Sequence, residues 1–228
     1  MYKLLIFDLD NTLIDYSATE RLAVERICQQ LDIKIDDCYH LYRDCNRRAR
    51  ESYPIITHEN LFDFRQKRVE LFLQSAQCFD KVSVDCFLTL YVTEMSKGII
   101  FDDVVAGLER LIGKCILVIG TNGDTTTRRN RIETSVLKDY FPWIFTSEML
   151  NCSKPQKDFF IKIIEQFPYE SSSVLAIGDD LRNDYICAKE AGIDFCFINR
   201  NGVKIDKSIT PQYVISSLTE LERFVNDN

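Results

Sequence analysis

Two carboxylates, Asp8 and Asp10, directly follow an apolar segment at residues 3–7. In an extended chain, residues two apart point to the same face, about 6.6 Å apart along the strand. If residues 3–7 form a parallel strand, both carboxylates lie at its carboxyl end, where open α/β sheets bind their ligands. A polar turn that caps the following helix is a comparable interpretation of this stretch alone, because Asp, Asn and Thr favour turns.

Two further segments place phosphate-binding residue types at the end of a predicted strand or the start of a predicted helix. Thr121 and Asn122 follow an apolar segment at 115–120, and a threonine hydroxyl with loop amides can hold a phosphoryl oxygen. This signal is weak by itself, since many strand-to-turn transitions look the same. Most lysines are solvated surface residues, but Lys154 precedes Pro155 and an amphipathic helix. A helix N-terminus is a natural anion site.

Three acidic residues, Asp179, Asp180 and Asp184, follow an apolar segment at 173–178. Placing such a cluster beside a buried strand costs free energy unless its members bind a cation or cap a helix. Helix capping explains one of the three well, but not all of them. Together with Asp8 and Asp10 they offer hard oxygen ligands, which favours Mg²⁺ over zinc.

Five short apolar segments, rich in β-branched or aromatic residues, predict buried parallel strands. They lie at residues 3–7, 115–120, 143–146, 173–178 and 195–199. Between the later segments, the spacing of Phe160, Ile163, Ile164 and Phe167 predicts a helix. This alternation indicates a doubly wound, Rossmann-like α/β fold with a parallel sheet.

The residues from about Tyr16 to Lys97 break this alternation. Residues 17–20 (Ser-Ala-Thr-Glu) fit a capping box at a helix start. Apolar residues then recur at helical spacing in three stretches: Val24, Ile27, Cys28, Leu31; Val69, Phe72, Leu73, Ala76; and Val84, Phe87, Leu88, Tyr91, Met95. We therefore expect a core domain of residues 1–15 and 98–228, with a helical domain of residues 16–97 inserted into it.

The four motifs, in this order and each at a predicted strand end or helix start, resemble those of the haloacid dehalogenase superfamily of hydrolases. By position, Asp8 matches the family's nucleophile and Asp10 its general acid/base. Thr121 matches the phosphate-binding hydroxyl, with the Asn122 amide beside it. Lys154 matches the lysine that neutralises the nucleophile and the transferring phosphoryl group. The inserted helices resemble the family's C1 cap.

The same resemblance implies a Mg²⁺ site. Asp179 matches the metal ligand, joined by the Asp8 carboxylate and the Asp10 carbonyl. Asp184 fits a supporting acid that acts through water, and Asp180 stands where the family often has serine, so it is not expected to be a ligand. Residues 141–148 and 178–184 are similar to the branch that hydrolyses pyrimidine 5′-monophosphates.

The resemblance implies a phosphatase that forms an aspartyl-phosphate on small phosphorylated metabolites, such as nucleoside 5′-monophosphates. A phosphosugar mutase or a sugar-phosphate phosphatase is the main alternative. A 2-haloacid dehalogenase is disfavoured, because that chemistry needs no protonated leaving group and uses no aspartate at the position of Asp10. A non-catalytic relative is disfavoured because all of the motif residues are present.

Composition and charge limit the binding partners and the cellular location that we expect. The 228-residue chain has a net charge of −7, which argues against a binder of nucleic acid polymers. No apolar run approaches the roughly 20 residues that cross a bilayer, and no export signal is recognisable, so we expect a cytoplasmic protein without a membrane partner. The nine scattered cysteines favour reduced thiols over disulfides or zinc. We expect a monomer or a homodimer.

Overall fold

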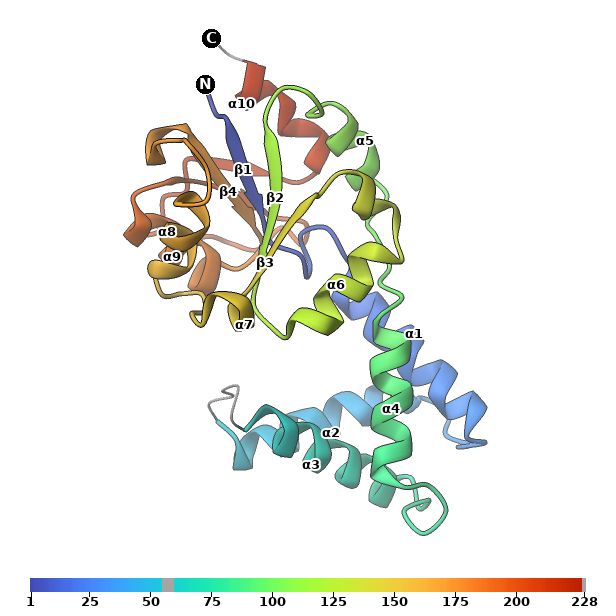
Figure 1. Cartoon of the computed structure of the whole chain (residues 1–228). Helices are drawn as coiled ribbons and strands as arrows, with labels where there is room; N and C mark the ends of the chain where they lie inside the picture. Colours follow the sequence, from blue (N-terminus) through green and yellow to red (C-terminus); the bar gives the residue numbers. More distant parts are fainter. Residues whose placement is uncertain (55–59, 227–228) are drawn as a thin grey trace. The chain divides into compact units, whose positions relative to one another are not determined.

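The computed structural model describes residues 1–54 and 60–226, which divide into two compact units (Figure 1). One unit comprises Met1–Tyr16 and Gly98–Asn228, and the other comprises Ser17–Lys97. No disulfide joins the nine cysteines, all of which belong to the described residues. Among these residues, no helix is both long enough and apolar enough to span a membrane.

The first unit is built on a parallel sheet with the strand order β3-β2-β1-β4-β5-β6. Its strands are β1 (Leu4–Phe7), β2 (Ile116–Thr121), β3 (Trp143–Thr146), β4 (Val174–Gly178), β5 (Asp194–Ile198) and β6 (Tyr213–Ile215). The predicted doubly wound α/β fold is confirmed, and the five predicted strands agree within one residue at each end. Strand β6 was not predicted, because its three residues are too short to give a periodic apolar signal.

Alternate residues of the central strand β1 anchor the two faces of the sheet. Leu5 and Phe7 pack with apolar residues of α5 (Val104–Glu109), α6 (Thr125–Glu133), η4 (Leu218–Glu220) and α10 (Glu222–Asn226). Leu4 and Ile6 pack on the opposite face with α8 (Asp158–Ile164) and α9 (Ile186–Ala191). Because both faces are covered, the strands are apolar throughout, as expected for a parallel sheet. Shorter elements complete this unit: η1 (Val136–Asp139), α7 (Ser147–Leu150), η2 (Ser171–Ser173) and the π-helical turn η3 (Leu181–Tyr185).

The second unit is helical. Its helices are α1 (Tyr16–Gln30), α2 (Cys38–Ser52), α3 (Leu61–Ser75) and α4 (Val84–Met95). The Tyr42 ring lies at the centre of its core, with centroids 5.6 Å from Phe72 and 6.0 Å from Phe87. Leu31 lies one residue beyond α1, and Ala76 caps the C-terminus of α3.

The capping box predicted at residues 17–20 is wrong. Helix α1 already begins at Tyr16, so Ser17 and Glu20 lie inside its first turns. The carboxylate of Glu20 instead enters the core of the helical unit, where it accepts hydrogen bonds from Tyr91 (2.7 Å) and Arg68 (3.4 Å). A local sequence pattern cannot show whether Glu20 caps a helix or forms a buried ion pair, because its partners in the structure come from two other helices.

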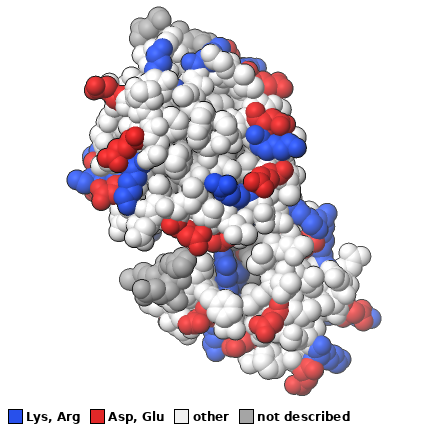
Figure 2. All heavy atoms as spheres, in the orientation of Figure 1, with Lys and Arg blue, Asp and Glu red and all other residues white. Residues whose placement is uncertain are grey.

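Charged side chains are interspersed on the face drawn in Figure 2. Basic and acidic residues alternate there, and no broad basic stripe is seen among the described residues on this face.

Candidate active site

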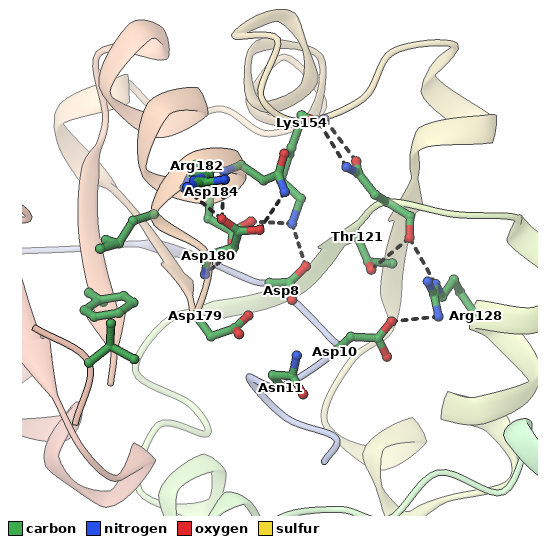
Figure 3. A pocket seen from close by; sticks show the side chains of 15 residues that line it. Asp8, Asp10, Asn11, Thr121, Arg128, Lys154, Asp179, Asp180, Arg182 and Asp184 are labelled. Carbon is green, nitrogen blue, oxygen red and sulfur yellow. Dashed lines mark hydrogen bonds and ion pairs between the residues drawn. The ribbon is translucent and has the colours of Figure 1, made fainter. Parts of the chain in front are cut away.

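The predicted site residues gather at the carboxyl edge of the sheet. Asp8 follows β1, Thr121 ends β2, and Asp179 follows β4, and these three strands are neighbours in the sheet. A pocket of about 420 Å³ opens here (Figure 3). All of the site residues expected from the sequence line it, namely Asp8, Asp10, Thr121, Asn122, Lys154 and Asp179, together with Asp180 and Asp184.

Lys154 is buried beneath the pocket and touches two carboxylates. Its Nζ lies 2.5 Å from Oδ1 of Asp8 and 2.6 Å from Oδ1 of Asp184, and it donates a hydrogen bond to the carbonyl of Gly120 at 3.0 Å. Its side chain is 2% exposed. Burial alone lowers the pKa of Lys154, but Asp184 and Asp8 outweigh that effect and leave its pKa raised. The lysine is therefore a fixed positive charge beside Asp8.

Three carboxylates form a cluster that fits a divalent cation. Asp8, Asp179 and Asp184 each offer an oxygen, and these atoms lie within 4.8 Å of one another. Burial, opposed by Lys154 and reinforced by Asp184, raises the pKa of Asp8 to about 7. Burial and the Asp8 carboxylate raise the pKa of Asp179 to about 8. A cation among these oxygens would offset that repulsion, and an all-oxygen donor set suits Mg²⁺.

Asn122 holds the main chain of Lys154. Its Oδ1 accepts a hydrogen bond from the Lys154 amide at 2.9 Å, and its Nδ2 donates one to the Lys154 carbonyl at 3.0 Å. The side chain of Asn122 is thus occupied in positioning Lys154, whereas its expected contribution to phosphate binding is the backbone amide. The adjacent Thr121 lines the pocket at the end of β2.

Asp180 caps the turn η3 and lies outside the carboxylate cluster. Its Oδ1 accepts hydrogen bonds from the amides of Arg182 (2.7 Å) and Asn183 (3.1 Å). The cluster itself contains Asp8, Asp179 and Asp184. Asp180 is therefore the one acid of its segment whose position helix capping explains.

Asp10 also lies outside the carboxylate cluster and is held by two arginines that the sequence analysis did not identify. Its Oδ1 lies 2.6 Å from Nη1 of Arg131, and its Oδ2 lies 2.9 Å from Nη1 of Arg128. Both arginines come from α6, the helix that follows Thr121 and Asn122. Their spacing of three residues puts them on one side of a helix, which was the available signal, but nothing in the sequence indicated that this side faces Asp10.

The helical unit carries a second pocket, of about 590 Å³, lined in part by Arg21, Arg43, Arg47 and Arg50. The guanidinium groups of Arg21 and Arg43 lie 5.2 Å and 5.9 Å from the centroid of the Tyr39 ring. Arg47 pairs with Asp44, which also lines this pocket.

The fold and the site define a doubly wound α/β protein with a cluster of carboxylates at the carboxyl edge of its parallel sheet. The profile of the haloacid dehalogenase-like hydrolases matches residues 5–198, so the chain belongs to that family. The family and enzyme class expected from the sequence are thereby confirmed.

Relatives with assigned names cover nearly the whole chain. N-acylneuraminate-9-phosphatase of Mus musculus is 27% identical over 94% of this chain and 90% of its own length. Pyrimidine 5′-nucleotidase PynA of Streptococcus pneumoniae is 28% identical over 96% of this chain and 93% of its own. The HAD-hydrolase YfnB of Bacillus subtilis, solved bound to magnesium, is 26% identical over 99% of both chains, with a TM-score of 0.83.

Proposed function

We propose that this protein is a Mg²⁺-dependent phosphate monoester hydrolase in which Asp8 is the nucleophile. The observation that carries the proposal is the environment of Asp8. Its carboxylate contacts the buried ammonium of Lys154 and has an oxygen within 4.8 Å of oxygens of Asp179 and Asp184. Asp10, two residues further along the chain, lines the same pocket. This arrangement places a nucleophile beside a fixed positive charge that can hold a phosphoryl dianion, and beside acids that could hold a cation.

The reaction proceeds in two steps. An oxygen of Asp8 attacks phosphorus in line with the ester oxygen, and the bond from phosphorus to that oxygen breaks as Asp10 donates a proton to the leaving alkoxide. Asp10 then accepts a proton from the water that attacks the aspartyl-phosphate, which releases phosphate and restores Asp8. Lys154 and the Thr121 hydroxyl stabilise the equatorial oxygens.

Asp8, Asp179, the Asp10 carbonyl and, through water, Asp184 would hold Mg²⁺. The ion would supply charge stabilisation for the phosphoryl oxygens and permit Asp8 to approach a dianion. Two observations support a cation here: the carboxylate oxygens within 4.8 Å of one another, and the magnesium bound by YfnB.

For the substrate we propose small phosphorylated metabolites, with nucleoside 5′-monophosphates as the first candidates. The similarity to pyrimidine 5′-nucleotidase PynA supports this choice. Sugar-acid or sugar phosphates are the second candidates, supported by the equally extensive similarity to N-acylneuraminate-9-phosphatase. We further propose that residues 16–97 act as a cap on a core of residues 1–15 and 98–228.

The test is a phosphate-release assay on pyrimidine and purine 5′-monophosphates, N-acylneuraminate 9-phosphate and hexose phosphates, with Mg²⁺ or with a chelator. A halide-release assay on 2-chloropropionate accompanies it. We expect Mg²⁺-dependent phosphate release and no halide release. Asp8→Asn should lower kcat by about 10³-fold or more while the far-ultraviolet circular dichroism is unchanged. Isomerisation of a sugar phosphate without phosphate release would indicate a mutase, and full activity of Asp8→Asn would exclude Asp8 as nucleophile.

A further inference from the structure

Both oxygens of the Asp10 carboxylate are held by separate guanidinium groups from one helix, and Figure 3 shows Asp10 directed toward Arg128. The Asp10 side chain is 21% exposed, whereas Arg131 is 3% exposed and Arg128 is 16% exposed. Charge-assisted contacts of 2.6 Å and 2.9 Å in such a setting fix the direction of a short side chain. Asp10 therefore has one preferred orientation before any substrate arrives.

The two arginines are themselves held in place. Nε of Arg128 donates a hydrogen bond to the carbonyl of Asn122 at 3.0 Å. The guanidinium of Arg131 lies 5.9 Å from the centroid of the Tyr16 ring. Gly123 leaves space for Arg128, since a Cβ at that position would lie 2.7 Å from its Nε. The orientation of Asp10 thus depends on packed groups of α6 rather than on mobile surface charges.

The two arginines direct the Asp10 carboxylate away from the neighbouring carboxylate cluster. Asp8, Asp179 and Asp184 point their oxygens toward a common centre, but the Asp10 side chain does not join them. A cation at that centre would attract any nearby carboxylate. The two guanidinium groups compete with that attraction and keep the Asp10 oxygens beside the pocket, which Arg128 lines and where a leaving group would depart.

We propose that Arg128 and Arg131 are positioning residues that hold Asp10 for proton transfer to the leaving alcohol and away from the cation-binding carboxylates. The inference rests on the proposed phosphatase function, because it assigns the arginines a role through Asp10. Arg131 is the buried anchor on Oδ1, and Arg128 is the contact on Oδ2 at the pocket wall.

If the arginines position Asp10 for proton transfer, their loss should affect substrates differently according to whether the leaving group needs a proton. Departure of an alkoxide requires a proton, whereas 4-nitrophenolate departs without one. The ratio kcat/KM reports only the steps up to departure of the alcohol, so it excludes the later hydrolysis of the aspartyl-phosphate. Loss of the arginines should therefore lower kcat/KM for alkyl phosphates selectively.

The experiment compares kcat/KM for 4-nitrophenyl phosphate with that for the best alkyl phosphate of the phosphate-release assay. The variants are Arg128→Gln, Arg131→Gln and Arg131→Lys, and Arg129→Gln is the matched control on the exposed side of α6. We expect the two Gln variants to lose at least about ten-fold on the alkyl ester and less than about three-fold on the aryl ester. Arg131→Lys should recover part of the loss, and Arg129→Gln should match the wild type.

Equal losses on the two esters, or a rise in KM alone, would overturn the positioning role and leave Arg128 as a substrate-binding group. If Arg131→Gln does not fold, Arg128→Gln decides the question, since its side chain lies at the pocket wall. Failure of the wild type to hydrolyse either ester would instead contradict the proposed function itself.

Discussion

The side chain of Asn122 makes two hydrogen bonds to the main chain of Lys154, at 2.9 Å and 3.0 Å, across 32 residues of sequence. This pair ties the end of β2 to the segment before α8. It fixes the backbone from which Lys154 extends to Asp8 and Asp184. Asn122 therefore acts on the site through the lysine.

Asn122→Ala should lower kcat by about 10-fold to 100-fold, because a small displacement of an aligned catalytic group is costly. The measurement is steady-state hydrolysis of 4-nitrophenyl phosphate, with the melting temperature recorded alongside. Asn130→Ala, at an exposed position of α6, is the control and should leave both quantities unchanged. A kcat within two-fold of the wild type for Asn122→Ala would show that the contacts of the Lys154 ammonium with Asp8, Asp184 and the Gly120 carbonyl suffice to place it.

Gly178→Ala should disrupt the carboxylate cluster. A Cβ at Gly178 would lie 2.2 Å from Oδ2 of Asp184 and 2.6 Å from its Cγ, so the Asp184 carboxylate must leave its present position. We expect lower stability and a weaker stabilisation by added Mg²⁺, measured as the shift in melting temperature over a Mg²⁺ titration.

Gly107→Ala is the matched control for that substitution. Its Cβ would meet Leu218 at 2.9 Å, in the apolar cluster that contains Leu218. Both variants should be destabilised by about 1–3 kcal/mol through overpacking, but only Gly178→Ala should lose Mg²⁺ affinity. Equal Mg²⁺ responses in the two variants would argue against a role for Asp184 at the cation.

The metal-free protein should respond to pH through Asp179. Burial and the Asp8 carboxylate raise the pKa of Asp179 to about 8, so the folded state retains a proton that the unfolded chain releases. The stability contributed by this proton is complete below the unfolded pKa, near pH 4, and is lost as the pH rises to about 8.

The Asp179→Asn substitution removes the ionisable group, and with it the loss of stability that this group causes as the pH rises. In urea unfolding with a chelator present, the variant should gain stability relative to the wild type as the pH rises from 4 to 8. Asp158→Asn, an exposed acid in the first turn of α8, is the control for removal of one carboxylate. A difference between Asp179→Asn and the wild type that does not change with pH would show that Asp179 is ionised throughout this range.

Glu20→Ala should destabilise the helical unit by about 3–5 kcal/mol, because it leaves the guanidinium of Arg68 buried without its carboxylate. The Glu20 and Arg68 side chains are 9% and 6% exposed. The free energy of unfolding, from urea denaturation followed by circular dichroism, measures the effect. Glu25→Ala, at an exposed position of the same helix, should cost less than about 0.5 kcal/mol. Similar values for the two variants would show that the buried pair adds no net stability.

The sequence by itself determined five of the six strands and the edge of the sheet at which the candidate site residues gather. The strand ends carrying Asp8, Thr121 and Asp179 were identifiable because buried parallel strands are continuous apolar segments. Their order along the chain then implied a common site, since parallel strands end at one edge of the sheet. Lys154 was identifiable from its position before a proline and an amphipathic helix.

Only the tertiary structure decided how these side chains are paired. The contacts of Asp10 with Arg131, of Lys154 with Asp184 and of Glu20 with Arg68 join different elements of the chain. Local patterns show that a helix exists, but the side of the helix that faces a given carboxylate depends on how the helix packs. For the same reason the sequence could not show that Asp180 caps a turn while Asp184, four residues later, reaches Lys154.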